Sequence, residues 1–391
     1  MRLGSPVSSF SYSTCAYVRT ATFPMKILTV VGARPQFIKA AVVSRLLAAQ
    51  SQCTEVLIHT GQHYDERMSD VFFRELSIPV PTANLAIGSG SHGAQTAQML
   101  IGIEQELQKH RPDLCLIYGD TNSTLAGALA AAKLHIPVAH VEAGLRSFNK
   151  RMPEEINRIT ADHCSTLLFS ASPVSTANLL REGIAQAQIV EAGDVMYDAT
   201  LFYLDGAVNH QDVLCRLGLE EKSYALATLH RAENTDDPRR LCAIFDALLR
   251  VAEHYAVVLP LHPRTVAALQ RQAIAAEVRT RLRIIEPVGY LEMLALERSA
   301  AVVATDSGGV QKEAYYAGTP CVTLRDETEW VELVELGFNS LCSPTVGAQR
   351  MAEVILEAKE QCTALAKDVS LYGGGRAGER IVEALAGFAG R

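Results

Sequence analysis

The turn Asp306-Ser307-Gly308-Gly309 could hold an anion, because it follows a β-branched run and opens a helical pattern. Small residues and free backbone N–H groups at a helix start let an anion approach, and each such contact is worth about 0.3 to 2 kcal/mol. Glu313 would lie one or two turns into that helix, where its carboxylate could bind ribose hydroxyls. A capped helix with glycine at a tight turn, and a surface salt bridge for Glu313, explain the same residues without a ligand.

A second turn of this kind is Gly32-Ala33-Arg34-Pro35, where proline favours a helix start and Lys39 follows within the first turns. Two cations near a helix N-terminus oppose the helix dipole, which is unfavourable for stability alone. Anion binding by Arg34 and Lys39 would explain their presence. Solvated surface charges are the alternative.

Carboxylates and imidazoles follow several other predicted strands. Proton transfer at a carbon atom needs bases held on one or both faces of the substrate, and such groups in a closing cleft meet that need. Taken singly, each could equally be a helix cap or a satisfied polar group. The residues are Asp120, Glu142, Glu154 and Glu155 in the first half of the chain, and His230 and His262 in the second.

Other catalytic motifs do not fit this sequence. The stretch 373–378 matches G-x-G-x-x-G in letters, but no strand precedes it and 13 residues follow, so we expect a turn before the last helix. There is no Walker A motif, no serine in a G-x-S-x-G context, and no His/Cys spacing typical of zinc. We therefore expect no metal.

The candidate residues all follow short apolar runs that alternate with helical patterns, which is typical of parallel sheets flanked by helices. Ligands of such folds gather beyond the carboxyl ends of the strands. The expected strands are 26–31, 56–60, 114–118, 137–141 and 167–170 in one set, and 224–229, 257–261, 282–285, 301–305 and 321–324 in another. Two sheets fit this pattern, with a linker at 194–204.

The composition agrees with a two-domain enzyme. At 391 residues the chain exceeds the size at which single cores usually stop growing. Its 48% apolar and 20% charged residues are typical of a soluble globular protein. A net charge of −7 without a Lys/Arg-rich run argues against a nucleic-acid partner.

The cysteines and the hydropathy of the sequence indicate the cellular compartment. Nine scattered cysteines without a Cys-x-x-Cys pair predict reduced, mostly buried thiols and a cytoplasmic protein. No apolar run approaches the ~20 residues of a membrane span, so we expect no membrane partner. Residues 1–24, rich in Ser and Thr, are interpreted as a disordered N-terminal extension or a start codon placed too early, with Met25 opening the first strand.

Seven motifs follow one another along the chain. They are Gly-Ala-Arg-Pro at 32–35, Gly-Asp-Thr at 119–121, Val-Glu-Ala-Gly-Leu-Arg at 141–146, Pro-Glu-Glu-Ile-Asn-Arg at 153–158, His-Arg at 230–231, Thr-Asp-Ser-Gly-Gly-Val-Gln-Lys-Glu at 305–313 and Arg-Asp-Glu-Thr-Glu at 325–329. In this order they resemble the non-hydrolysing UDP-N-acetylglucosamine 2-epimerases across residues 25 to about 385, and the ordered set is specific to that family.

The resemblance implies an α/β fold of two Rossmann-like domains with parallel sheets, of the glycosyltransferase-B type, with the active site in the interdomain cleft. The N-terminal domain would be 25–193, completed by the C-terminal helix 373–391. The UDP-binding domain would be 194–372. A homodimer is the implied assembly.

The implied reaction interconverts UDP-GlcNAc and UDP-ManNAc without a cofactor. UDP is eliminated to give a glycal, and its re-addition after reprotonation on the other face inverts C2. Asp120, Glu142 and Glu154 correspond to the catalytic carboxylates and His230 to the catalytic histidine; which carboxylate takes the C2 proton stays open. The UDP-sugar contacts correspond to Arg34, Lys39, Ser307, Gly308, Gly309, Glu313 and Arg325, and His262, which follows a predicted strand of the second half, is expected as a further contact.

The sequence also departs from the usual bacterial pattern. The loop 147–152 is shorter, 328–332 differ from the usual Thr-Glu-Arg-Pro, and Asp65 and Ser91-His92 stand where a regulatory substrate site has other residues. These features resemble the branch that acts on UDP-2,3-diacetamido-2,3-dideoxyglucuronate. Its acidic sugar would suit the cations Lys150 and Arg151.

Two functions of other classes compete with the epimerase. One is a retaining UDP-sugar glycosyltransferase of the same architecture, and the other is a UDP-sugar-binding protein without chemistry. Three carboxylates in the first half favour the epimerase, because they exceed what a transferase cleft usually needs.

Overall fold

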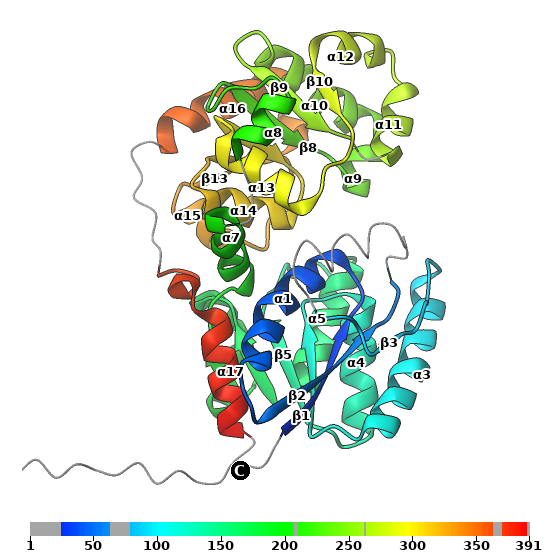
Figure 1. Ribbon diagram of the computed structural model, residues 1–391. Coiled ribbons are helices and arrows are strands. Elements are labelled where there is room, and N and C mark those ends of the chain that lie inside the picture. The colour runs from blue at the N-terminus through cyan, green and yellow to red at the C-terminus, as the bar shows by residue number, and fades with distance from the viewer. Residues whose placement is uncertain (1–24, 63–78, 207–209, 262, 363–369, 389–391) are drawn as a thin grey trace, which may run out of the picture.

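The computed structural model describes residues 25–62, 79–206, 210–261, 263–362 and 370–388, and it contains two parallel β-sheets stacked end to end (Figure 1). The first sheet has the order β3-β2-β1-β4-β5-β6-β7. Its strands are β1 (Met25–Val31), β2 (Cys53–His59), β3 (Ala83–Asn84), β4 (Leu114–Tyr118), β5 (Val138–Ala143), β6 (Leu167–Ser170) and β7 (Ile189–Glu191). β1 therefore lies inside the sheet, with β2 and β3 on one side of it and β4 to β7 on the other, so the strand order reverses between β1 and β4.

The second sheet repeats this plan with the order β10-β9-β8-β11-β12-β13. Its strands are β8 (Tyr224–Thr228), β9 (Ala256–Pro260), β10 (Arg283–Ile285), β11 (Val302–Thr305), β12 (Cys321–Thr323) and β13 (Asn339–Leu341). The reversal lies here between β8 and β11. Such reversals leave a crevice beyond the carboxyl ends of the two strands, where ligands of open α/β sheets bind.

Helices cover both faces of each sheet, so alternate residues of one strand enter different cores. On β1, Ile27 and Val31 pack under α1 and under α17 (Ala377–Phe388), whereas Leu28 and Val30 pack under α3 and α4. The helices of the first half are α1 (Arg34–Ala48), α3 (His92–His110), α4 (Asn122–Lys133), α5 (Pro153–Cys164) and α6 (Pro173–Arg181).

The second half has the same layered plan. Helices α10 and α16 bury one face of its sheet, and α8, α13 and α14 bury the other. The helices are α8 (His210–Arg216), α9 (Ala232–Thr235), α10 (Pro238–Val251), α11 (Pro263–Gln270), α12 (Ala275–Arg281), α13 (Tyr290–Ser299), α14 (Gly308–Ala317), α15 (Val331–Glu335) and α16 (Ala348–Cys362).

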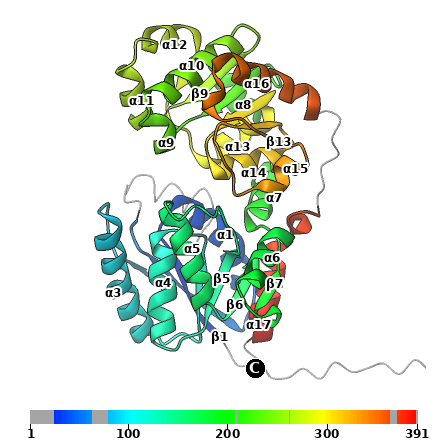
Figure 2. The same ribbon diagram turned by 180° about the vertical axis from the view of Figure 1, so that it is seen from behind.

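Two helices connect the halves. The stretch 194–204, expected as a linker, forms α7 (Val195–Gly206), whose buried residues share one apolar core with α1 and with Tyr315 and Tyr316 of α14. The last helix, α17 (Ala377–Phe388), returns to the first half and lies beside α1 (Figures 1 and 2). The expected linker is thus a packed helix, and the 373–375 turn precedes α17 as predicted.

The predicted strands are all present, with ends shifted by up to three residues. The sequence pattern missed β3, β7 and β13, which have two or three residues each and lie at sheet edges. So few residues carry no periodicity that separates a strand from a loop.

None of the seven cysteines whose side chains the structure describes forms a disulfide, and fewer of them are buried than expected. Cys115, Cys321 and Cys342 are buried, whereas the other four are partly or fully exposed. No helix in the described ranges has the length and apolar character required to cross a bilayer. The expected N-terminal extension, 1–24, lies outside the described residues.

Candidate active site

Asp120 lies in the turn after β4 and is held by α5. Arg158 Nη2 donates to Asp120 Oδ2 at 2.5 Å, and Asn157 Nδ2 donates to the Asp120 carbonyl at 2.9 Å. The Asp120 side chain is 31% exposed, so its carboxylate faces solvent at the carboxyl end of the sheet. A substrate in the crevice could reach it.

Glu142 lies at the end of the neighbouring strand β5, where the register shifts and the backbone is left-handed, with φ of 70°. Lys39 donates to one carboxylate oxygen, and Lys312 Nζ donates to the other at 2.9 Å. Burial alone would raise the pKa of Glu142, but the two ammonium groups outweigh it and hold that pKa well below its ordinary value. Glu142 is therefore ionised.

The adjacent residues Glu154 and Glu155 open α5 and have different surroundings. Glu154 is exposed, and its side chain makes no hydrogen bond or ion pair with the described residues. Glu155 is buried and accepts from the backbone N–H groups of Ser147 at 3.0 Å and Phe148 at 2.9 Å. Glu155 thus shapes the 147–152 loop, whereas Glu154 is free to meet a ligand.

A buried ion network supports the turn that carries Asp120. His140 Nε2 lies 2.7 Å from the Gly119 carbonyl oxygen, and His140 Nδ1 lies 2.7 Å from Asp162 Oδ1. Burial would raise the pKa of Asp162, but the hydrogen bond from His140 and the charge of Arg146, 2.8 Å away, lower it overall. These groups fix the peptide immediately before Asp120.

The turn after β8 faces the turn after β11 in the second sheet. The Asp306 carboxylate is fully buried and accepts from the backbone N–H groups of His230 and Arg231, each at 3.1 Å. His230 Nδ1 lies 3.4 Å from Asp306 Oδ1, and the His230 side chain is 53% exposed. Asp306 therefore orients the His230 turn, and of the Asp/Ser pair that the sequence offers as a helix cap, Ser307 takes that place.

Ser307 is the N-cap of α14, as the sequence predicts, and its Oγ accepts from Val310 N at 3.4 Å. Gly308 is half-buried and Gly309 is exposed at the helix start. A Cβ atom on Gly308 would lie 2.4 Å from Glu329 Oε1, whereas one on Gly309 would meet nothing closer than 3.9 Å. The exposed backbone at Gly309 can therefore accept an anion at the positive end of the helix.

Glu313 and Arg325, two further predicted contacts, are buried. The pKa of Glu297 on α13 is raised, mainly because Glu297 is itself buried and also because the negative charge of Glu313 on α14 is close to it. Arg325 is 1% exposed, with Nη1 donating to Glu329 Oε2 at 2.9 Å and Nε 3.5 Å from Glu233 Oε1. Arg325 thus reaches a ligand only if these carboxylates move.

Some predicted residues lie outside the described part of the chain. They are His262, Asp65 and the side chain of Arg34, whose backbone begins α1. Of the other regulatory positions, His92 Nδ1 lies 3.2 Å from Asn122 Nδ2. Lys39, predicted as a substrate contact, is engaged with Glu142.

Sequence reasoning assigned no role to Lys312, Asp194 or Arg158, although all three lie at this centre. Lys312 bonds Asp194 as well as Glu142, and Arg158 bonds Asp120. The available signal was a lysine and an arginine inside the ordered motifs at 305–313 and 153–158. Which carboxylates they meet depends on tertiary contacts.

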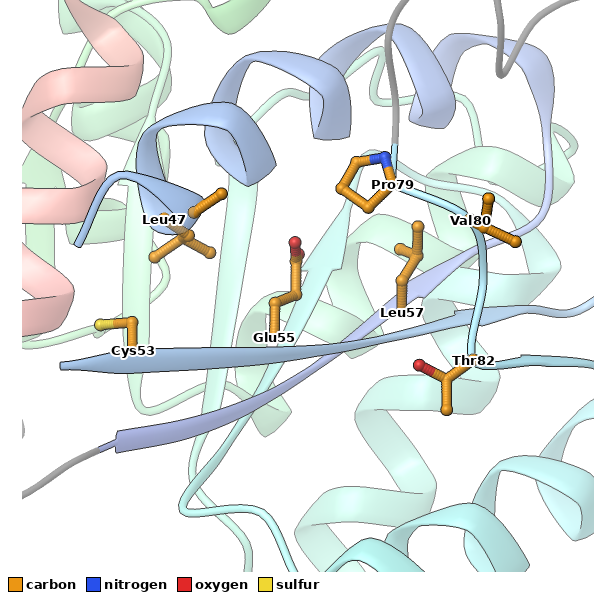
Figure 3. A pocket seen from close by; sticks show the side chains of 8 residues that line it. Leu47, Cys53, Glu55, Leu57, Pro79, Val80 and Thr82 are labelled. Atoms are coloured by element: carbon orange, nitrogen blue, oxygen red, sulfur yellow. The ribbon is translucent and has the colours of Figure 1, made fainter. Parts of the chain in front are cut away.

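A separate cavity of about 190 Å³ lies between α1, β2 and residues 79–82 (Figure 3). Glu55 points from β2 toward α1 and accepts from Thr29 Oγ1 at 2.6 Å, and burial raises its pKa. The cavity runs along β2, away from the strand ends that carry the other carboxylates. We assign it no ligand. Among the described residues, no group of three His, Cys, Asp or Glu side chains could hold a metal ion.

Comparisons with known proteins agree with this geometry. The sequence model of the UDP-N-acetylglucosamine 2-epimerase family matches residues 45–386. The chain is 52% identical over 370 residues to the UDP-2,3-diacetamido-2,3-dideoxy-D-glucuronate 2-epimerase of Pseudomonas aeruginosa, covering 93% of this chain and 99% of that one. It is 44% identical over 368 residues to the UDP-N-acetylglucosamine 2-epimerase of Methanocaldococcus jannaschii, covering 92% and 99%.

Solved structures give the same result. The crystal structure of the M. jannaschii UDP-GlcNAc 2-epimerase in complex with UDP-GlcNAc and UDP matches with a TM-score of 0.84 and 43% identity, over 92% of this chain and 99% of that chain. The Neisseria meningitidis enzyme bound to UDP-GlcNAc matches with a TM-score of 0.83 and 30% identity, over 92% and 99%. The two sheets are thus of the glycosyltransferase-B type, and this chain belongs to the UDP-N-acetylglucosamine 2-epimerase family.

Proposed function

We propose that this chain inverts C2 of a UDP-activated 2-acetamido sugar by eliminating and re-adding UDP. The observation that carries the proposal is the juxtaposition of two strand ends. Lys312 of α14, the helix that Ser307 caps, reaches Glu142 at the edge that also carries Asp120. A diphosphate at the α14 start would place the attached sugar near these carboxylates.

The proposed reaction begins with transfer of the C2 proton to an enzyme carboxylate. The electron pair of the C2–H bond forms the C1–C2 double bond, and the C1–O bond breaks with its pair going to UDP. Reprotonation of C2 on the other face and attack of the UDP oxygen at C1 give the epimer. The step involves no net oxidation, so no redox cofactor takes part.

In this proposal the carboxylates of the first half act on the sugar, and the residues of the second half hold UDP. Asp120 and Glu154 exchange protons with the sugar because they are solvent-accessible, and Glu142 stays ionised between its two lysines. His230 lies across the crevice near the leaving diphosphate. The turn Ser307-Gly308-Gly309, with Glu313 and Arg325 nearby, retains UDP between elimination and re-addition. Arg34 and Lys39 complete the substrate contacts that the resemblance implies, and His262 is a further expected contact.

The preferred sugar in this proposal is UDP-2,3-diacetamido-2,3-dideoxy-D-glucuronate, with UDP-GlcNAc as the second candidate. The P. aeruginosa enzyme named for the first sugar shares 52% identity with this chain, against 44% for the M. jannaschii enzyme. Asn149 Nδ2 donates to Glu327 Oε1 at 3.0 Å, so the 147–152 loop reaches the second half. Lys150 and Arg151 on that loop are exposed, and their side chains pair with no described residue, so they could meet a uronate carboxylate.

We also infer two domains, 25–193 with 373–391 and 194–372, working as a cytoplasmic homodimer. The separate sheets and the packing of α17 on α1 support the division. The assembly and compartment rest on the family resemblance. Light scattering of the purified chain measures the assembly directly.

The deciding experiment incubates the protein with each sugar nucleotide in deuterated water. We expect deuterium at C2 of substrate and product, faster with the diacetamido-uronate. A Lys150→Met/Arg151→Met variant should lose kcat/KM for the uronate and keep it for UDP-GlcNAc. Transfer to an acceptor without C2 exchange would identify a glycosyltransferase, and UDP binding without any turnover a binding protein.

A further inference from the structure

Four buried charges form one cluster between the halves: Lys39, Glu142, Asp194 and Lys312. Lys312 Nζ donates to Glu142 Oε1 at 2.9 Å and also to Asp194, and Lys39 donates to Glu142 Oε2. The four side chains are between 1% and 9% exposed. Two ammonium groups balance two carboxylates, so the cluster is neutral although it is buried.

Lys312 is held on several sides. Its Nζ lies 3.9 Å from the centre of the Trp330 ring, a distance typical of a cation–π contact. Its partner Asp194 also accepts from Tyr316 Oη at 2.7 Å and from Met196 N at 2.8 Å. The ammonium group is therefore fixed toward Glu142.

Glu142 needs such support because its backbone is strained. A non-glycine residue with φ of 70° persists only where surrounding contacts determine the conformation. Lys39 comes from α1 of the first half, whereas Lys312 comes from α14 and lies five residues after the Ser307 cap of that helix. The two ammonium groups thus fix the carboxylate from both halves of the molecule.

We propose that Lys312 is a positioning residue: it orients the Glu142 carboxylate against the sugar and joins it to the helix that retains UDP. This inference rests on the proposed epimerase function. It goes further because it assigns to Lys312 a part in the reaction that requires no contact with the substrate. It also makes the Glu142 geometry depend on the packing of α14 against the first half.

The charge of Lys312 should be visible in the pH profile. The charged or titratable groups around Glu142 are Lys39 on α1, Asp120 after β4, Asp194 before α7, and Lys312 and Tyr316 on α14. With both ammonium groups present, Glu142 stays ionised at ordinary working pH. Removing one leaves burial opposed by Lys39 alone, so the pKa of Glu142 rises and activity should fall on the acid side.

The test compares full-length Lys312→Met, the charge-balanced Lys312→Met/Asp194→Asn, and Lys359→Met as a matched control. Lys359 also lies over an aromatic ring, 5.0 Å from the centre of Tyr255, but on α16. We measure C2 exchange from pH 5 to 9, UDP affinity by calorimetry, and thermal unfolding.

We expect Lys312→Met to lower kcat by about 100-fold, as for a misplaced catalytic group, with UDP affinity kept. An acidic limb that wild type lacks should enter the measured pH range, because Asp194 is left without its lysine and Lys39 alone opposes the burial of Glu142. The double variant should regain thermal stability but not kcat, and Lys359→Met should match wild type.

The outcomes separate the two proposals. No C2 exchange by the wild-type chain overturns the epimerase and this inference together. Exchange by wild type with a fully active Lys312→Met, or with kcat restored in the double variant, overturns the positioning role alone. In the second case Lys312 would serve only to neutralise Asp194.

Discussion

Gly308 and Gly309 adjoin at the start of α14, and alanine should affect them in different ways. A Cβ on Gly308 would lie 2.4 Å from Glu329 Oε1 and 3.6 Å from Arg231 Nη2. The Glu329 side chain is 8% exposed and bonded to Arg325 at 2.9 Å, so it cannot withdraw freely. Gly308→Ala should therefore destabilise the fold by about 1 to 3 kcal/mol, as overpacking does, and lower Tm by about 2 to 10 °C.

Gly309→Ala should leave stability within about 0.5 kcal/mol of wild type, because the new methyl would lie at ordinary contact distance from Ser307 Oγ, 3.9 Å, and from Glu313 Oε1, 4.0 Å. The methyl would, however, occupy the exposed space where we place the diphosphate. We expect UDP affinity to fall at least about tenfold, equivalent to about 1.4 kcal/mol. Thermal unfolding and UDP titration by calorimetry on both variants measure the two effects separately.

Either half of this prediction can fail. If Gly309→Ala binds UDP as tightly as wild type, the diphosphate does not approach that backbone. If Gly308→Ala melts like wild type, Glu329 has room to move and is not fixed by Arg325.

Three further predictions concern carboxylates. Asp120→Asn and Glu154→Gln should each lower kcat by about 10² to 10⁴-fold while keeping UDP affinity, since both would exchange protons with the sugar; C2 exchange at full rate would contradict that role. Asp162→Asn should cost about 3 to 5 kcal/mol in unfolding free energy, because it removes the buried carboxylate that pairs with Arg146 and bonds His140; denaturant titration measures this, and an unchanged midpoint would refute it. Burial raises the pKa of Asp198 from 3.8 to about 6, so the protonated carboxyl group favours the folded state. This stabilising contribution is complete below about pH 4 and is lost as the pH rises through 6. Asp198→Asn should flatten Tm over that range, and a slope equal to that of wild type would contradict the assignment.

The sequence did not predict the charge partners within the cluster of Lys39, Glu142, Asp194 and Lys312. The motifs at 32–35, 141–146 and 305–313 predicted that Lys39, Glu142 and the α14 turn belong to one site. They did not predict that Glu142 bonds Lys312, 170 residues away, or that Lys312 bonds Asp194, 118 residues away. Such pairings depend on how the two sheets pack, which no local pattern records.

The surroundings of single polar residues were likewise not predicted from the sequence. Glu154 and Glu155 are chemically alike, yet the packing of α5 buries Glu155 against the 147–152 loop and leaves Glu154 exposed. Asp306 and Ser307 could each cap the following helix, yet Ser307 is the cap and the Asp306 carboxylate accepts from the backbone of His230 and Arg231. Each outcome depends on which neighbour fills the adjacent space.

The sequence by itself determined the strand and helix pattern, the polar residues at the strand ends and the family. These follow from local periodicity and from ordered motifs, which need no knowledge of distant contacts. Tertiary structure alone decided the charge partners, the short edge strands and the packing of α7, because these depend on residues that meet only after the chain folds.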